Sequence, residues 1–155
     1  MKKEMLLGFL KGHILFEELI PQELDIVARR LSVQEVDTGQ MLFREGDNAE
    51  FFCLVAQGSL EVIKKGKDGR PLVIATLGDG DSVGEMSMVD GMVRSATVQA
   101  TFYSIVIVLQ RKDFEKILKE YPRIGAKLLK GIARHISVNL RRTSSELTNL
   151  MMPIA

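Results

Sequence analysis

The segment from Gly84 to Val98 combines side chains that can hold a sugar phosphate. It contains a glycine followed by a glutamate, a short apolar turn, one arginine and then small residues. The carboxylate of Glu85 can accept hydrogen bonds from sugar hydroxyls, and the guanidinium of Arg94 can form two parallel charge-assisted bonds with a phosphate. Backbone N–H groups at the start of a helix can bind the same anion. The segment therefore predicts a binding site for a sugar phosphate.

The order of these residues resembles the phosphate-binding cassette of cyclic nucleotide-binding domains. That family has a Gly-Glu pair, a short apolar turn, Pro-Arg, a small residue, alanine and then a strand. The chain follows this order and departs from it at Val93, where the family usually has proline. Upstream, the Glu-Gly-Asp turn at 45–47, with Gly39 and Gly58, is similar to the first half of the family's β-roll. The resemblance implies cAMP or cGMP as a bound ligand, with no catalytic cofactor.

The resemblance also implies a role for each cassette residue. Arg94 would anchor the phosphate inside the roll, where shielding from water strengthens charge-assisted bonds. Glu85 would accept a hydrogen bond from the ribose 2′-hydroxyl, Gly84 would let the backbone approach the ligand, and Ala96 would offer a backbone N–H group. The predicted ligand-binding residues of this segment are Gly84, Glu85, Met86, Ser87, Arg94, Ser95 and Ala96.

The same residues have simpler explanations. Arg94 taken alone would more often be a surface side chain paired with Asp90 or Glu85, and Glu85 also suits the positive end of a helix dipole. Because the motif lies in the context that the family requires, we favour ligand contact. In the family, threonine after the arginine is associated with guanine, and alanine or serine with adenine. Ser95 therefore favours cAMP, with cGMP or a cyclic dinucleotide as alternatives.

Two further expectations concern packing around this segment. Met86, Met88 and Val89 are expected to be mainly core residues, although Met86 also belongs to the predicted ligand-binding set. Ser82 and Val83 are smaller than the aromatic residues that the family often has at these positions. Looser packing or a small cavity is therefore expected there.

The surrounding sequence predicts an α+β fold, in which helices flank an antiparallel β-roll or jelly roll, also described as a double-stranded β-helix. From about 32 to 109, short β-rich runs alternate with Gly and Asp turn signals, as in antiparallel rolls. Strands are expected at 51–55, 60–64, 72–77 and 104–109, with a hairpin tip at 67–69. A short helix is expected within the cassette.

Helices are expected on both sides of the roll. Residues 4–31 carry apolar side chains at helical spacing, and Pro21 suits the first turn of a helix. The C-terminal helices are expected from about 112 to 150, with a break at Tyr121-Pro122. Gly131 is expected to be a weak point in the long final helix.

The final helix has apolar residues at heptad spacing, which predicts a two-stranded coiled coil and hence a homodimer. The seam comprises Leu129, Ala133, Ile136, Leu140, Thr143, Leu147 and Leu150. Around Thr143 the sequence resembles the dimerisation helix of the catabolite activator protein family, in which a Thr-Ser pair presents hydroxyls to the adenine amino group. The resemblance implies that Thr143 contacts the base in its own subunit and Ser144 the base bound across the dimer. A register-setting polar residue or a solvated helix end would also explain Thr143.

Composition limits the class of protein. The chain has 155 residues, of which 46% are apolar and 26% charged, and a net charge of +1. These values are typical of one soluble globular domain and give no sign of nucleic-acid binding. The apolar runs are strand-sized and no signal-peptide pattern is present, so neither a membrane span nor secretion is expected. Since the single cysteine excludes an internal disulfide, we expect one cytoplasmic domain spanning residues 1–155.

No residue pattern supports catalysis or a metal site. His13 and His135 lie far apart in the sequence; His13 is expected on a helix surface and His135 on the long helix, away from its seam. Neither a Walker loop nor a catalytic triad is present, and Cys53 is expected to be a buried thiol in a strand. The chain is therefore expected not to be an enzyme.

Two functions remain open at this point. The first is a cyclic nucleotide sensor that holds its ligand between the roll and the long helix and signals to an unidentified output protein by moving that helix. The second is a structural dimerisation module that has kept the fold and lost the ligand. The family's transcription factors continue into a winged helix-turn-helix, whereas this sequence ends at Ala155, so direct DNA binding is not expected. The basic residues of the last helix are expected to form a solvated face, and they are Lys127, Lys130, Arg134, Arg141 and Arg142.

Overall fold

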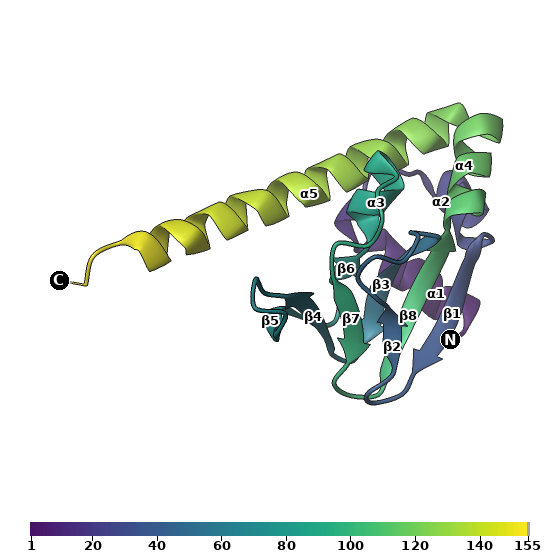
Figure 1. The fold of residues 1–155 in the computed structure, drawn as a ribbon. Helices are drawn as coiled ribbons and strands as arrows, with labels where there is room; N and C mark the ends of the chain where they lie inside the picture. Colours follow the sequence, from purple (N-terminus) through teal and green to yellow (C-terminus); the bar gives the residue numbers. More distant parts are fainter. Residues whose placement is uncertain (155) are drawn as a thin grey trace.

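Strands β3 (Phe51–Gln57) and β8 (Ser104–Gln110) form the centre of the computed structural model, which describes residues 1–154 (Figure 1). Both strands are apolar along most of their length because both of their faces are covered. Phe52 of β3 faces a core beneath the helices, whereas Cys53 beside it faces a second core between two sheets. This alternation follows from the two-residue period of a strand.

Two four-stranded antiparallel sheets make up the roll. One has the order β1-β8-β3-β6 and the other the order β2-β7-β4-β5. The remaining strands are β1 (Leu31–Val36), β2 (Met41–Phe43), β4 (Leu60–Lys65), β5 (Pro71–Leu77), β6 (Ser82–Val83) and β7 (Thr97–Ala100). The β4–β5 hairpin closes where the N–H of Gly66 donates to the carbonyl of Arg70. The predicted α+β fold with an antiparallel β-roll is confirmed, and the four predicted strands lie where expected.

Three short helical segments precede the roll, where the sequence pattern predicted helix throughout residues 4–31. They are α1 (Lys3–Lys11), the 3₁₀ turn η1 (Ile14–Phe16) and α2 (Pro21–Ala28). The ring Nδ1 of His13 accepts a hydrogen bond from the backbone N–H of Leu15, which starts the 3₁₀ turn. Pro21 begins α2 as predicted. A residue in the first helical turn has no intrahelical partner for its backbone N–H, so proline, which lacks this group, loses no hydrogen bond there.

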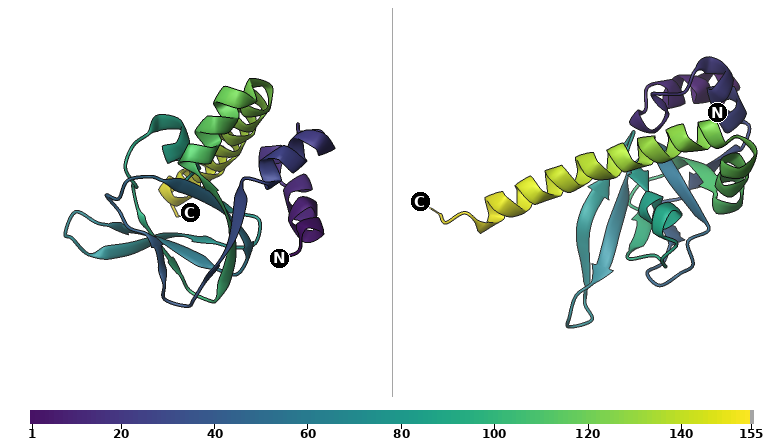
Figure 2. Two further views of the ribbon diagram at one scale, coloured as in Figure 1. Left: turned by 90° about the vertical axis from the view of Figure 1, so that its right-hand side faces the viewer. Right: turned by 90° about the horizontal axis from the view of Figure 1, so that it is seen from above.

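Two helices follow the roll, α4 (Arg111–Glu120) and α5 (Pro122–Met151), with the predicted break at Tyr121. The first half of α5 packs on η1 and α4, whereas residues 143–151 project beyond the roll and are exposed (Figures 1 and 2). Within residues 1–154, none of the helices combines the length and the apolar character needed to cross a membrane.

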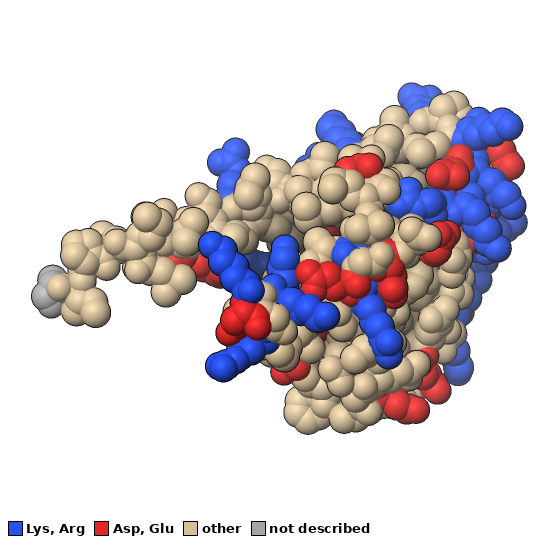
Figure 3. Space-filling model, in the orientation of Figure 1, with Lys and Arg blue, Asp and Glu red and all other residues tan. Residues whose placement is uncertain are grey.

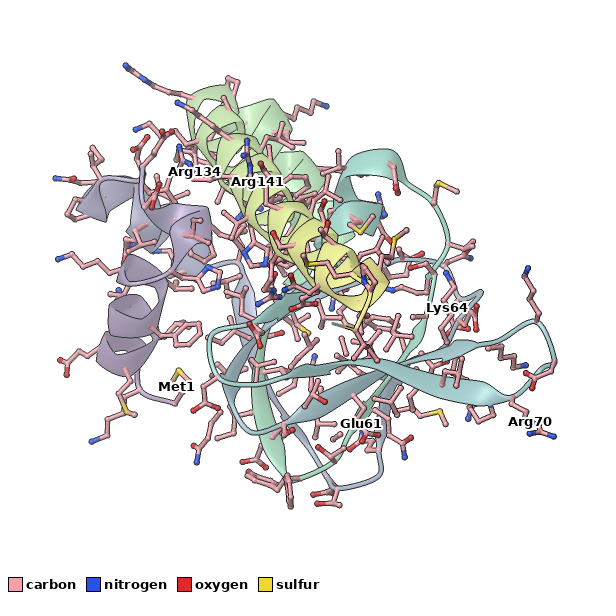
Figure 4. The ribbon with its side chains drawn as sticks, turned by 90° about the vertical axis from the view of Figure 1, so that its left-hand side faces the viewer. Met1, Glu61, Lys64, Arg70, Arg134 and Arg141 are labelled. Atoms are coloured by element: carbon pink, nitrogen blue, oxygen red, sulfur yellow. The ribbon has the colours of Figure 1, made fainter. Side chains whose placement is uncertain are left out.

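Ion pairs join the first half of α5 to the N-terminal helices. Arg134 pairs with Glu17 and Glu18, and Figure 4 shows it on the side of α5 that faces these helices. Lys127 Nζ lies 2.5 Å from Glu23 Oε1. The expected solvated basic face is therefore wrong for these residues, because acidic partners lie opposite them. Exposed pairs of this kind contribute about 0–1 kcal/mol each.

Gly131 marks a close contact between α5 and η1, and it is not simply a weak point in the helix. A Cβ atom at this position would lie 2.2 Å from the backbone oxygen of Leu15. Gly131 is buried, and its neighbour Ile132 belongs to the core beneath the helices. The absence of a side chain therefore lets α5 approach the N-terminal segment.

Replacing Gly131 with alanine should destabilise the protein. Alanine favours a helix by about 1 kcal/mol, but overpacking against a backbone atom costs about 1–3 kcal/mol, and displacing η1 would disturb the core further. Urea unfolding measures the difference. Gly8→Ala in α1 is the matched control, because nothing lies within 4 Å of a Cβ there, and it should be neutral or stabilising. Equal stability of the two variants would contradict the close contact.

Candidate functional site

A cavity of about 220 Å³ lies between the cassette (residues 84–98), the sheet containing β7 and β4, and helix α5. Its walls combine apolar side chains, among them Val62 and Leu77, with the polar groups of the cassette. The structure brings the predicted cassette residues to this cavity, and they are Gly84, Glu85, Met86, Ser87, Arg94, Ser95 and Ala96.

Two glycines shape the cassette. Gly84 precedes the short helix α3 (Glu85–Asp90) and Gly91 follows it, and both have positive φ angles, of 87° and 69°. Residues with a Cβ atom rarely adopt this conformation. A Cβ at Gly84 would also lie 2.3 Å from Nη1 of Arg94. Gly84 therefore allows both the turn into α3 and the approach of the guanidinium.

Arg94 is buried, with 2% of its surface exposed. Its Nη2 donates to the carbonyl of Phe51, and its guanidinium carbon lies 3.9 Å from the ring centroid of Phe43. Within residues 1–154 no carboxylate lies within ion-pair distance of it, and its Nε has no hydrogen-bond partner. Burial lowers the pKa of Arg94. The site thus holds a buried cation without a counter-ion, and the simpler explanation of a surface ion pair is wrong.

The Glu-Gly-Asp turn at 45–47 fixes the backbone of Arg94. The N–H of Arg94 donates to the carbonyl of Asp47 at 2.8 Å, and the N–H of Gly46 donates to the carbonyl of Arg94 at 2.8 Å. The N–H of Glu45 donates to the hydroxyl of Thr97. Two motifs that lie about fifty residues apart in the sequence therefore hold one side chain in place.

Glu85 is the second buried charged group at the cavity, with 7% of its surface exposed. Its Oε2 has no hydrogen-bond partner among the described residues. Burial raises its pKa, and nearby Arg94 offsets this in part. Buried polar groups are normally hydrogen-bonded. A carboxylate and a guanidinium with unused hydrogen-bonding atoms in one cavity suit a ligand with a hydroxyl and an anionic group.

Two packing expectations around the cassette are wrong, and two are confirmed. Met86 and Val89 are 58% and 57% exposed, because α3 turns them outward, whereas Met88 is buried as expected. Ser82 and Val83 are buried and both line the cavity, so the small cavity expected beside them is present. Beside the cavity, the hydroxyl of Ser82 has a hydrogen-bond partner on α5.

That partner is His135, whose Nε2 lies 2.6 Å from the Ser82 hydroxyl. His135 and His13 are both buried, and their ring centroids lie 5.9 Å apart. The expected surface position of His13 is therefore wrong, because its ring is enclosed between η1, the Gly80 turn and α5. The structure describes no cluster of metal-binding side chains within residues 1–154. Cys53 is a buried thiol as predicted, and burial raises its pKa to about 12.

Helix α5 lines the cavity with Asn139, which was not predicted from the sequence, and with Arg142, which was expected on a solvated basic face. Thr143 and Ser144 follow them directly but are exposed and do not line the cavity. Their contacts with a base therefore stay a prediction. One signal was available in the sequence, because residues 135, 139 and 142 are polar and share one helical face.

Comparison with known proteins gives consistent matches. A family model for the cyclic nucleotide-binding domain matches residues 33–121. The chain is 35% identical over 116 residues to the lysophospholipase nte1 of Neurospora crassa, and 29% identical over 127 residues to the cyclic AMP receptor protein of Thermus thermophilus. These matches cover 75% and 82% of the chain, which spans only 8% and 59% of the two relatives' own lengths.

The fold has a matching solved structure. The crystal structure of a cyclic nucleotide-binding domain from Methylobacillus flagellatus superposes with a TM-score of 0.86 at 26% sequence identity. The match covers 98% of this chain and 85% of that one. The similarity therefore includes the helices on both sides of the roll.

Proposed function

Because the chain belongs to the cyclic nucleotide-binding domain family, we propose that it binds a cyclic nucleotide in the cavity between the cassette and α5. The observation that carries this proposal is the buried Arg94, which has no counter-ion among the described residues and lines the same cavity as Glu85, whose Oε2 is unpaired. A buried charge without a partner is costly. A ligand phosphate would supply the missing counter-ion.

The proposed ligand spans the cavity from the cassette to α5. Its phosphate accepts hydrogen bonds from Arg94, whose Nε is unused, and from the backbone N–H of Ala96. Its ribose 2′-hydroxyl donates to Glu85 Oε2. The base then lies toward α5, near Asn139 and Arg142. The predicted contacts of Thr143 and of a partner subunit's Ser144 would lie further along the same helix.

cAMP is the favoured ligand. Ser95 follows the arginine of the cassette, and one relative is named for cyclic AMP. cGMP is the second candidate, because Arg142 lines the cavity and arginine pairs well with the O6 and N7 atoms of guanine, whereas asparagine pairs with adenine. The side chain of α5 that meets the base thus decides between the two nucleotides.

Calorimetric titration with cAMP and with cGMP tests the proposal, with linear AMP as the control. We expect micromolar or tighter binding to at least one cyclic nucleotide, equivalent to about 8 kcal/mol, and much weaker binding of AMP. If neither cyclic nucleotide binds, the alternative of a ligand-free structural dimerisation module takes over.

The regulatory part of the proposal is movement of α5. Helix α3 lies against α5, and the cavity has walls on both elements. A ligand that prefers one position of α5 would change how its projecting end is presented. We further propose that the protein acts in the cytoplasm as a sensor without catalytic activity, that it signals to a separate output protein, and that it does not bind DNA directly.

The projecting end of α5 supports the proposed homodimer. The seam residues Leu140, Leu147 and Leu150 are 66%, 56% and 84% exposed. Figure 3 shows that this end is almost free of charged side chains. Exposed apolar residues at heptad spacing are typical of a helix that forms a coiled coil with a second helix.

Leu140→Lys should therefore convert a dimer to a monomer, because a charge at the seam would be buried against its copy. Sedimentation velocity measures the change. Ser145→Lys adds the same charge on the outer side of α5, five residues further on, and should leave the dimer intact. A wild-type protein that is monomeric at high concentration would contradict the proposed seam.

A further inference from the structure

Four side chains form a continuous polar chain from β6 to the cavity. The Ser82 hydroxyl lies 2.6 Å from Nε2 of His135, and the amide nitrogen of Asn139 lies 3.0 Å from the same ring atom. Nη2 of Arg142 donates to the amide oxygen of Asn139 at 3.4 Å. Ser82, Asn139 and Arg142 all line the cavity. The imidazole ring of His135 on α5 is therefore connected to Asn139 and Arg142, two polar side chains at the proposed position of the base.

The bond between His135 and Asn139 depends on the protonation of the ring. The amide nitrogen of Asn139 can only donate, so Nε2 of His135 must accept, which a neutral imidazole can do and an imidazolium cannot. On protonation, Nε2 becomes a donor. It can donate to the hydroxyl oxygen of Ser82 or, if Asn139 rotates, to the amide oxygen of Asn139. In either case the amide nitrogen of Asn139 loses its acceptor on the ring, and a rotated amide also removes the acceptor that Arg142 uses.

The ring of His13 has a similarly fixed state. Its Nδ1 accepts from Leu15 N–H, so its Nε2 carries the proton that is donated to the carbonyl of Gly80 at 2.7 Å. Burial lowers the pKa of His13, and the Gly80 carbonyl and Asp81 offset this in part. Both rings are therefore neutral in the arrangement that the fold stabilises.

Few charged groups face His135. Burial lowers its pKa most, His13 lowers it further, Asp81 from the turn before β6 raises it, and Arg142 of its own helix lowers it. Arg134, which precedes it on α5, is paired with Glu17 and Glu18 of the N-terminal segment. Burial and the cation of Arg142, joined by His13 when its ring is protonated, thus oppose the single carboxylate of Asp81.

We propose that His135 is a positioning residue: its neutral ring holds Asn139 and Arg142 toward the base of the ligand, and its protonation releases them. This inference rests on the proposed function for its effect on affinity. The hydrogen-bond chain itself is a property of the ligand-free protein and can be tested without a nucleotide.

NMR of the ligand-free protein tests the hydrogen-bond chain. The side-chain amide signals of Asn139 and the Nε signal of Arg142 should shift with the same midpoint as the ring of His135 between pH 8 and pH 5. His135→Gln should abolish the common transition. His13→Gln should keep the transition and move its midpoint to higher pH, because it removes a neighbour that opposes protonation. Asn139 signals that stay constant while His135 titrates would overturn the proposal.

Calorimetry with cAMP tests the effect on binding. As the pH is lowered from 8 to 5.5, wild-type affinity should fall more than the affinity of His135→Gln does. The extra loss should be below about tenfold, because the pKa of the ring lies below its ordinary value of 6.5 and the ring is only partly protonated at pH 5.5. The pH dependence left in the variant comes from the other buried titratable groups, Glu85, whose pKa is raised, and His13, whose pKa is lowered. Equal pH dependence in the two proteins would overturn the role in binding. A wild type that binds no cyclic nucleotide would instead overturn the proposed function. The NMR titration would still test the hydrogen-bond chain from Ser82 to Arg142.

Discussion

Arg94→Ala should weaken cyclic nucleotide binding by about 2–5 kcal/mol, or roughly 30-fold to 5,000-fold. The guanidinium is buried and stacked on Phe43, so its orientation is set before the ligand arrives. Its bonds to the carbonyls of Phe51 and Gly84 leave Nε unused. A phosphate bound there would meet a cation that has already lost its water, and alanine would remove that cation.

Calorimetry on three variants separates charge from geometry. Arg94→Lys keeps the charge but lacks the planar fork, so its affinity should lie between those of the wild type and Arg94→Ala. Arg70→Ala removes an arginine at the exposed hairpin tip, where the side chain is 84% exposed, and should bind like the wild type. Circular dichroism would check that each variant is folded. A folded Arg94→Ala variant with wild-type affinity would show that the phosphate lies elsewhere.

Glu85→Gln should stabilise the ligand-free protein while weakening binding. Burial raises the pKa of Glu85 above its ordinary value of 4.5, so the fold favours the protonated form. The charged form therefore costs stability above pH 4.5, and the cost grows until the pH passes the raised pKa. Because glutamine carries no charge, the variant should gain about 0.5–2 kcal/mol in free energy of unfolding at pH 7.5. The gain should shrink as the pH approaches 4.5.

The same substitution should remove recognition of the ribose. A hydrogen bond to a charged group contributes about 1.5–3 kcal/mol, so the wild type should prefer cAMP to 2′-deoxy-cAMP by tenfold or more, and Glu85→Gln should prefer it far less. Comparing both nucleotides on both proteins forms a double-mutant cycle, which isolates the contact between Glu85 and the 2′-hydroxyl. Glu61→Gln on β4 is the control, because Glu61 does not line the cavity. An unchanged preference for the 2′-hydroxyl in Glu85→Gln would remove Glu85 from the site.

The cassette could be predicted from the sequence because its geometry is local. Gly84 and Gly91 have the positive φ angles that a short helix between two turns requires. Only ten positions separate Gly84 from Arg94, and the Glu-Gly-Asp motif marks the turn that fixes Arg94 from outside. The strands were predictable for the same reason, since turn residues and alternating apolar residues lie next to one another in the chain.

Contacts made by α5 could not be predicted, because they join segments far apart in the sequence. Gly131 looked like an ordinary helix-weakening residue until η1 was placed against it. His13 was expected on a helix surface and His135 only on the long helix away from its seam, yet both are buried with their rings side by side. Asn139 and Arg142 line the cavity only because α5 passes over the cassette at that point. Helical periodicity gives the faces of a helix and does not say which element each face meets.

A crystal structure of the protein grown with cAMP tests the central claim most directly. We predict that the cyclic phosphate accepts hydrogen bonds from the guanidinium of Arg94, and that the ribose 2′-hydroxyl lies within hydrogen-bonding distance of Glu85 Oε2. An empty cavity at saturating nucleotide, or a nucleotide bound with its phosphate away from Arg94, would contradict the account.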